Sequence, residues 1–274
     1  MEKQNTEKLR TYNDEQLREF VSAVRDASLE MHEENPYFYI VSLNGGLGRY
    51  DVLKVVDREF VSSRTIFLPG SSKIKDSAEV MTRCFENFFL EKRDETVEKR
   101  QIVSLDEVVS GNSVERLFNA YNSASRRIFR AQYGNGYDNR NKVEEEAKVL
   151  REKFPIKVYG IAEIRDEKNK KALAYQNRIK TGEVLEYPVK KIITMDELDY
   201  QPVEFAHPNI LNPTGQGFLP KVKDIRITEK YINLLREIGM ISGANPDEVC
   251  SLAAVQGSKI MSDCEKYSRK PEYK

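Results

Sequence analysis

The sequence contains little cysteine and histidine, which limits the disulfide and metal chemistry that it can support. Its three cysteines, Cys84, Cys250 and Cys264, are scattered along the 274 residues without CxxC spacing. That pattern argues against a disulfide framework and against a structural zinc site. The two histidines, His32 and His207, are too few for a histidine-rich metal centre. We therefore expect a reduced, cytoplasmic protein.

The sequence also lacks a surplus of either charge, because 44 Lys and Arg residues stand against 44 Asp and Glu residues. Nonspecific nucleic-acid binding requires an excess of cations that displace counterions, so we expect no broad nucleic-acid-binding surface. No apolar run approaches the roughly 20 residues of a membrane-spanning helix. Residues 1–10 are polar and contain no signal-peptide core. The sequence thus predicts a protein that makes no membrane contact.

What the sequence does contain is a series of apolar runs of strand length that alternate with amphipathic helical patterns. Strands are predicted at 37–43, 64–68, 101–105 and 156–164, with one or two more within 183–193. Helices are predicted at 14–31, 51–56, 76–90, 113–130 and 142–153. This alternation is typical of βαβ units, so we expect an α/β fold with a mainly parallel sheet flanked by helices.

Both ends of the chain carry helix-start signals. Asn13 and Gln16 form a capping-box pattern before the N-terminal helix. Proline, asparagine and glycine become dense over residues 199–220, which places a boundary between an α/β core (1–205) and a mostly helical C-terminal extension (206–274). Thr228 and Asn245 are the predicted starts of the two helices in this extension. The apolar faces of these helices suit either coverage of the sheet or a homodimer contact.

The strongest functional signal lies between residues 101 and 114. A predicted strand delivers two carboxylates, Asp106 and Glu107, to its carboxyl end. A short polar loop then opens a helix, and it contains Ser110, Gly111, Asn112 and Ser113. The free amides and the dipole of a helix amino terminus favour a phosphate. Because carboxylates can bind vicinal sugar hydroxyls or hold Mg²⁺ through water, the pattern predicts a ribose 5-phosphate ligand.

This run resembles the phosphoribosyl diphosphate (PRPP) signature of type I phosphoribosyltransferases. The resemblance implies a Rossmann-related phosphoribosyltransferase-like fold, with Asp106 and Glu107 on the ribose hydroxyls and residues 110–113 around the 5-phosphate. It also implies PRPP or a nucleotide as the ligand, and Mg²⁺ held indirectly by the two carboxylates. The polar loop is one residue shorter here than in the family pattern.

A second loop fits the same resemblance. Asn44, Gly45 and Gly46 follow the predicted strand at 37–43, and paired glycines permit close approach of a backbone to a ligand. The resemblance implies that this loop binds the pyrophosphate of PRPP. It also implies that residues 62–77 form a mobile lid whose cations neutralise the leaving pyrophosphate. The candidate lid cations are Arg64, Lys73 and Lys75.

Three functions remain open from the sequence. The first is an enzyme that transfers phosphoribosyl from PRPP to a nucleobase or another nitrogen acceptor. The second is a non-catalytic module of the same fold that binds a nucleotide or sugar phosphate, which the shortened loop favours. The third is a nucleotidyltransferase, because residues 43–48 (LNGGLG) are similar to the glycine-rich loop of UTP–sugar pyrophosphorylases, although the sequence departs from that pattern at Arg49.

Overall fold

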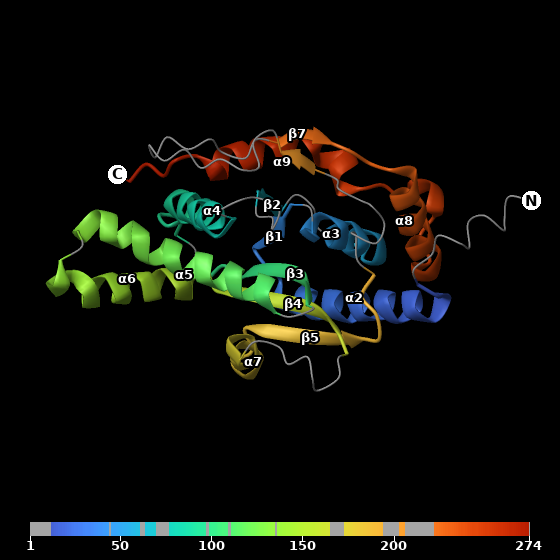
Figure 1. Cartoon of the computed structure of the whole chain (residues 1–274), viewed down its shortest axis with the longest axis horizontal. Coiled ribbons are helices and arrows are strands. Elements are labelled where there is room, and N and C mark those ends of the chain that lie inside the picture. Colours follow the sequence, from blue (N-terminus) through green and yellow to red (C-terminus); the bar gives the residue numbers. More distant parts are fainter. Residues whose placement is uncertain are drawn as a thin grey trace, which may run out of the picture.

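The computed structural model describes residues 12–43, 45–60, 64–69, 77–96, 99–108, 111–134, 136–164, 173–193, 203–205 and 222–273. Its centre is a five-stranded, fully parallel sheet in the order β2-β1-β3-β4-β5 (Figure 1). The strands are β1 (Phe38–Ser42), β2 (Thr65–Leu68), β3 (Ile102–Val108), β4 (Ile156–Glu163) and β5 (Val184–Val189). The predicted α/β architecture with a mainly parallel sheet is confirmed.

The apolar runs form these strands because both faces of the sheet are covered. All four residues of β2 are buried, and Ile40 and Val41 of β1 have exposed fractions of 1% and 0%. A strand enclosed on both sides cannot alternate polar and apolar residues, so a continuous apolar run is the sequence pattern that suits it. The same reason explains why these strands could be located from the sequence.

Helices cover the two faces of the sheet unequally. The chain moves from β1 to β2 in one direction and from β2 to β3 in the other, so right-handed crossovers place the connecting helices on opposite faces. One face carries α2 (Asp14–Glu34) and α3 (Gly45–Val56), and the other carries α4 (Ser77–Lys92), α5 (Asn112–Tyr133) and α7 (Leu173–Lys180). No helix in the described ranges has both the length and the apolarity to cross a membrane.

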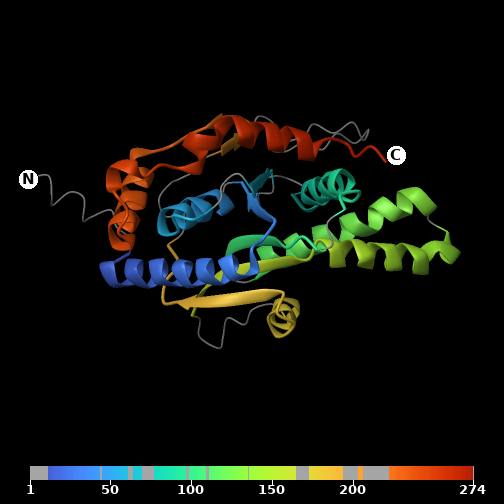
Figure 2. The same cartoon turned by 180° about the vertical axis from the view of Figure 1, so that it is seen from behind.

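An aromatic cluster holds α4 and α5 together. Phe85 and Phe89 of α4 both contact the Tyr121 ring of α5, with centroid separations of 5.6 and 5.4 Å. Phe88 meets Phe154 edge to face at 5.6 Å. Such pairs contribute about 0.5–1.5 kcal/mol each beyond simple burial. The far half of α5, together with its partner α6 (Arg140–Lys153), extends beyond the sheet (Figure 2).

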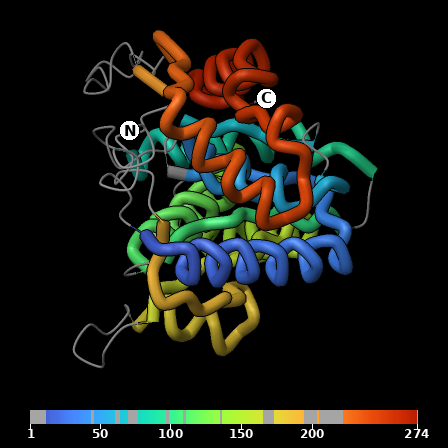
Figure 3. The backbone as a smooth tube through the Cα atoms, turned by 90° about the vertical axis from the view of Figure 1, so that its right-hand side faces the viewer, coloured from blue at the N-terminus to red at the C-terminus, as the bar shows by residue number. Residues whose placement is uncertain are grey.

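The C-terminal helices pack against the α/β core. α8 (Glu229–Ser242) contacts α2 and α3, whereas α9 (Leu252–Ser268) contacts β2 and α4. Figure 3 shows them (red) on the opposite side of the core from β5 and α7 (yellow). The predicted boundary after residue 205 falls between β6 (Val203–Phe205) and its antiparallel partner β7 (Val222–Ile225).

Two of the three predicted helix starts are confirmed, and one is wrong. The Asn13–Gln16 capping box is present, and the Thr228 side chain accepts the Tyr231 amide at the start of α8. Asn245 instead caps only a short 3₁₀ turn at Pro246–Glu248. The cap of α9 is Ser251, six residues after Asn245, and the amide of the first α9 residue, Leu252, donates to Asp51 of α3. This tertiary contact outweighs the local Asn-Pro signal.

Two boundaries near the predicted ligand loops also differ from expectation. β3 continues to Val108, so Asp106 and Glu107 lie within the strand, opposite Gly160 and Ile161 of β4. The strand extends beyond the apolar run at 101–105 because β4 continues to form ladder hydrogen bonds with it. α3 likewise begins at Gly45, before the predicted helix at 51–56, so its paired glycines form a first helical turn.

Candidate functional site

The two predicted ligand loops meet at one edge of the sheet. In the order β2-β1-β3, the connections from β1 and from β2 cross the sheet in opposite directions, so the strand order reverses between β1 and β3. Ligands of open α/β sheets bind at the carboxyl ends of the strands at such a point. α3 follows β1 at this edge, and α5 follows β3. The structure therefore brings the Gly45–Gly46 segment and the Asp106–Glu107 segment to neighbouring strand ends.

β1 and β3 separate as they approach this edge. Their parallel ladder ends at the pair Tyr39–Val103, well before β3 does. Beyond that pair, the buried Tyr50 hydroxyl hydrogen-bonds backbone groups of β3 on the side of β1. It accepts a hydrogen bond from the Leu105 amide at 3.2 Å and donates one to the Val103 carbonyl at 3.4 Å. Tyr50 belongs to α3, so this side chain replaces part of the missing ladder and fixes α3 over the gap between the two strands. We call this region, where the carboxyl ends of β1 and β3 diverge, the switch-point edge.

An ion pair connects the two loops directly. The Arg49 guanidinium, one turn into α3, donates to the Glu107 carboxylate of β3. The exposed fractions of the Arg49 and Glu107 side chains are only 11% and 12%. Each of these two mostly buried charges is stabilised by the other, because the removal of either partner leaves an uncompensated buried charge. Glu107 is thus engaged by the chain itself.

Asp106 faces a different set of partners. Burial raises the pKa of its carboxyl, while the nearby Arg49 charge, the Ser113 hydroxyl and Arg116 act in the opposite direction. Neighbouring strand residues point to opposite faces, which agrees with Asp106 lying toward α5 while Glu107 lies toward α3. The two carboxylates therefore do not converge on a single point.

The amino terminus of α5 is covered by α7. Gly111 precedes the helix with φ = 78°, and a Cβ there would lie 2.5 Å from Cγ of Tyr175. Tyr175 is itself fully buried, and its hydroxyl donates to Glu186 at 2.6 Å. The Ser113 hydroxyl lies close enough to the Asp106 carboxyl to oppose the rise of its pKa, and Ser110 lies outside the described residues. Of the predicted phosphate-binding residues, Gly111 is thus covered by Tyr175, Ser113 lies beside Asp106, and Asn112 is the first residue of α5.

The predicted pyrophosphate loop is a helix terminus. Gly45 and Gly46 open α3, and Asn44 lies outside the described residues. A Cβ on Gly46 would come no closer than 3.5 Å to Val41, an ordinary contact. What this edge offers to an anion is therefore the amides of this first turn and the α3 dipole, more than the conformational freedom of glycine.

The predicted lid cations are not assembled at this edge within the described part of the chain. Arg64 precedes β2 and donates to the Asn35 side chain at 3.0 Å and to the Pro36 carbonyl at 3.1 Å. Those partners precede β1, so Arg64 lies at the amino edge of the parallel sheet, opposite the switch-point edge. Lys73 and Lys75 fall outside the described residues.

The residues that could hold Mg²⁺ directly are also not brought together. Within the described ranges, no group of three or more His, Cys, Asp or Glu side chains is placed to hold a metal ion. Asp106 and Glu107 have different partners and different faces. As they lie, these carboxylates do not fit a shared Mg²⁺ ion, and Mg²⁺ stays a prediction from the resemblance.

Sequence reasoning missed a buried carboxylate next to the site. Asp51 of α3 is fully buried, accepts the Tyr231 hydroxyl at 2.7 Å, and accepts the Leu252 amide at the start of α9. Burial raises its pKa to about 6. The segment Arg49-Tyr50-Asp51, which had only marked a departure from the nucleotidyltransferase loop, thus supplies contacts to β3, α8 and α9. In the sequence, this segment is recognisable as three consecutive side chains with polar end groups, next to the apolar residues of a short helix.

The switch-point edge therefore combines a helix amino terminus, one buried Arg–Glu pair and one carboxylate with a raised pKa. Comparison with protein-family models, with curated proteins and with solved structures finds no match to this chain.

Proposed function

We propose that the protein binds a phosphorylated ribose, either PRPP or a nucleotide, at the switch-point edge. The observation that carries this proposal is the Arg49–Glu107 pair, because it links the segments after β1 and at the end of β3 that the sequence predicts for phosphate and ribose. The amides of the first turn of α3 add a second phosphate-binding feature at the same edge.

The ligand would replace the internal ion pair. Breaking a buried pair is costly when one charge is left alone, and less so when both charges find new partners. A ribose phosphate offers both: its phosphate suits the Arg49 guanidinium, and its vicinal hydroxyls suit the Glu107 carboxylate. A ligand with a phosphate but no diol would leave Glu107 unpaired, so the pair would select for the complete sugar phosphate.

The finer proposal is phosphoribosyl transfer to a nitrogen acceptor, and it rests on the resemblance of residues 101–114 to the PRPP signature. In this reaction, positive charge develops on the ribose as the pyrophosphate leaves. The Glu107 carboxylate, once released from Arg49, would stabilise that charge, and the Arg49 guanidinium would stabilise the leaving anion. Positioning and electrostatics would supply the catalysis, without a covalent intermediate on the chain.

A second candidate is the non-catalytic module of the same kind, which binds the ligand without turning it over. The contact between Gly111 and Tyr175 favours it, because that contact covers the helix terminus predicted for the 5-phosphate. The position of Ser113 beside the Asp106 carboxyl points the same way.

Calorimetric titration tests the proposal and separates its two forms. PRPP with Mg²⁺, a nucleoside monophosphate and UTP are titrated into the parent protein and into the double variant Asp106→Asn/Glu107→Gln. A matched control, Asp94→Asn/Glu152→Gln, removes two exposed carboxylates elsewhere. We expect PRPP or the monophosphate to bind the parent and the control, and to bind the site variant at least tenfold more weakly.

The outcomes are distinct. Release of pyrophosphate in the presence of nucleobases would favour the transferase, and binding without turnover would favour the module. Preferential binding of UTP would favour the nucleotidyltransferase alternative. If neither PRPP nor a nucleotide binds the parent, the proposal is wrong.

A further inference from the structure

A cleft elsewhere on the molecule is lined mostly by charged side chains. It has a volume of about 420 Å³ and lies between α4, the far half of α5 and the segment that follows α9. Charged side chains line it: Glu79, Arg83, Glu86, Arg127, Arg130 and Lys270. We call it the basic cleft, because its four cations exceed its two carboxylates.

The basic cleft is separate from the switch-point edge. α5 begins at that edge with Asn112, and Arg127 lies in its fifth turn. With a rise of about 1.5 Å per residue, Arg127 lies about 22 Å along the helix from Asn112. A ligand in the basic cleft would therefore not reach the Arg49–Glu107 pair.

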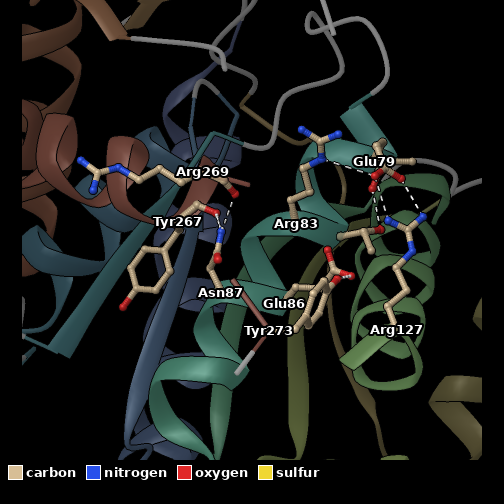
Figure 4. Close-up of polar contacts among 10 residues, drawn as sticks. Glu79, Arg83, Glu86, Asn87, Arg127, Tyr267, Arg269 and Tyr273 are labelled. Carbon is tan, nitrogen blue, oxygen red and sulfur yellow. Dashed lines mark hydrogen bonds and ion pairs between the residues drawn. The ribbon is translucent and has the colours of Figure 1, made fainter. Parts of the chain in front are cut away.

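One carboxylate in the cleft is shared by two arginines. Arg127 holds Glu79 through two hydrogen bonds of 2.8 and 2.7 Å, and Arg83 approaches the same carboxylate through Nε at 3.4 Å (Figure 4). The hydrogen bonds from Arg127 lower the pKa of Glu79, so it carries its charge. That charge compensates only one of the two arginines. The Arg83 Nη1 atom is buried and has no hydrogen-bond partner among the residues that the structure describes.

The other two cations of the cleft have no such compensation. Arg130 and Lys270 are exposed, and among the described residues neither side chain has an ion-pair or hydrogen-bond partner. A surface cation without a partner is ordinary when it stands alone. Here two of them line one concave site together with an arginine nitrogen that also lacks a partner.

The remaining carboxylate does little to balance this charge. Glu86 is 1% exposed, and burial raises its pKa. The Tyr273 hydroxyl donates to it at 2.9 Å, and the tyrosine ring lies against it (Figure 4). Four cations against two carboxylates leave the cleft with an excess of at least two positive charges, and desolvation of Glu86 opposes the charged form of one of those carboxylates.

The wall that carries Lys270 is held in place. The Asn87 amide of α4 donates to the carbonyls of both Tyr267 and Arg269 at 2.8 Å, which fixes the chain immediately before Lys270 (Figure 4). The cleft is therefore formed by three anchored segments, so a ligand would meet groups whose positions are already set.

We propose that the basic cleft binds the phosphate group of a small phosphomonoester. A phosphate dianion suits a cleft with an excess of at least two positive charges, and arginine forks suit its oxygen geometry. The volume lies in the range of about 300–1,000 Å³ typical of small-molecule pockets, so it leaves room for an organic group beyond the phosphate. This site stands independently of the ligand proposed at the switch-point edge.

Calorimetry at constant ionic strength tests this site with two probes, inorganic phosphate and ribose 5-phosphate. The cleft variant is Arg130→Gln/Lys270→Gln, which removes two exposed cations without breaking a described contact. The matched control is Lys148→Gln/Arg236→Gln, which removes two exposed cations on α6 and α8. A third protein, Asp106→Asn/Glu107→Gln, reports on the switch-point edge.

We expect inorganic phosphate, which offers no diol to the switch-point edge, to bind the parent, the control and the Asp106/Glu107 variant alike, and ribose 5-phosphate to bind the Asp106/Glu107 variant through the cleft. The cleft variant should bind inorganic phosphate at least tenfold more weakly, since each lost charge-assisted hydrogen bond costs about a factor of ten. Tighter binding of ribose 5-phosphate than of inorganic phosphate by the Asp106/Glu107 variant would support occupation of the remaining volume. Absence of binding by the parent, equal weakening in the control, or a loss seen only in the Asp106/Glu107 variant would overturn the assignment.

Discussion

The Arg49 side chain of α3 pairs with the Glu107 side chain of β3 across the gap in which β1 and β3 separate. The pair is mostly buried, so each charge depends on the other for stabilisation. It places the two predicted ligand loops in direct contact, and it also sets the cost that any ligand at this edge must offset.

The first prediction concerns this pair. Arg49→Gln should lower the free energy of unfolding by about 3–5 kcal/mol, because it leaves the Glu107 charge buried and uncompensated. Adding Glu107→Gln to that variant should recover a large part of the loss. Urea denaturation of the two single variants and the double variant measures the coupling, and Arg236→Gln, an exposed arginine of α8, serves as control. A double variant no more stable than Arg49→Gln would contradict this account of the pair.

The second prediction concerns the hydroxyl of Tyr50. Tyr50→Phe keeps the ring but leaves the Leu105 amide without its partner in the buried strand. Stability should fall by about 1–3 kcal/mol, the usual cost of an unsatisfied buried polar group. Tyr137→Phe, at a ring that is 81% exposed, should change stability very little. Equal effects of the two substitutions in urea denaturation would show that the hydroxyl does not support β3.

The third prediction compares two glycines with similar backbone angles. Gly111 (φ 78°, ψ −2°) and Gly243 (φ 73°, ψ 20°) both lie in the left-handed region, so alanine is strained at both, by about 1–2 kcal/mol. Only at Gly111 would the new Cβ clash with a ring, that of Tyr175, whereas nothing lies within 4 Å at Gly243. Gly111→Ala should therefore cost about 1–3 kcal/mol more than Gly243→Ala in thermal or urea unfolding. Similar losses would mean that α7 does not press on the start of α5.

The fourth prediction is a pH dependence that originates at Asp51. Burial raises its pKa from 3.8 to about 6, so the folded protein binds this proton more tightly than the unfolded chain does. Its contribution to stability is complete below about pH 4 and is lost as the pH rises through about 6. The loss amounts to at most about 3 kcal/mol, from a shift of about two pH units.

Asp51→Asn should remove this part of the pH dependence while it keeps the side-chain shape. The free energy of unfolding, measured from pH 4 to pH 7, should fall less steeply for this variant than for the parent. Asp94→Asn, at a side chain that is 87% exposed, should follow the parent curve. An unchanged slope in Asp51→Asn would place the raised pKa elsewhere.

The sequence by itself determined the elements whose signals are local. The apolar runs at β1, β2 and β4 are continuous because both faces of the sheet are covered, and that pattern is readable without knowledge of their neighbours. The caps at Asn13 and Thr228 are equally local, since each depends on a side chain and an amide three residues away. The parallel α/β architecture followed from the order of these elements.

Tertiary structure alone decided the details of the candidate site. β3 extends through Asp106 and Glu107 because β4 pairs with it. The sequence of β3 alone does not predict that pairing. Arg49 and Asp51 acquired their roles from β3, α8 and α9, which lie far away in the sequence. The basic cleft likewise unites α4, α5 and the C-terminal segment. Charges separated along the chain become a site only when folding removes water between them, and local sequence patterns do not contain that information.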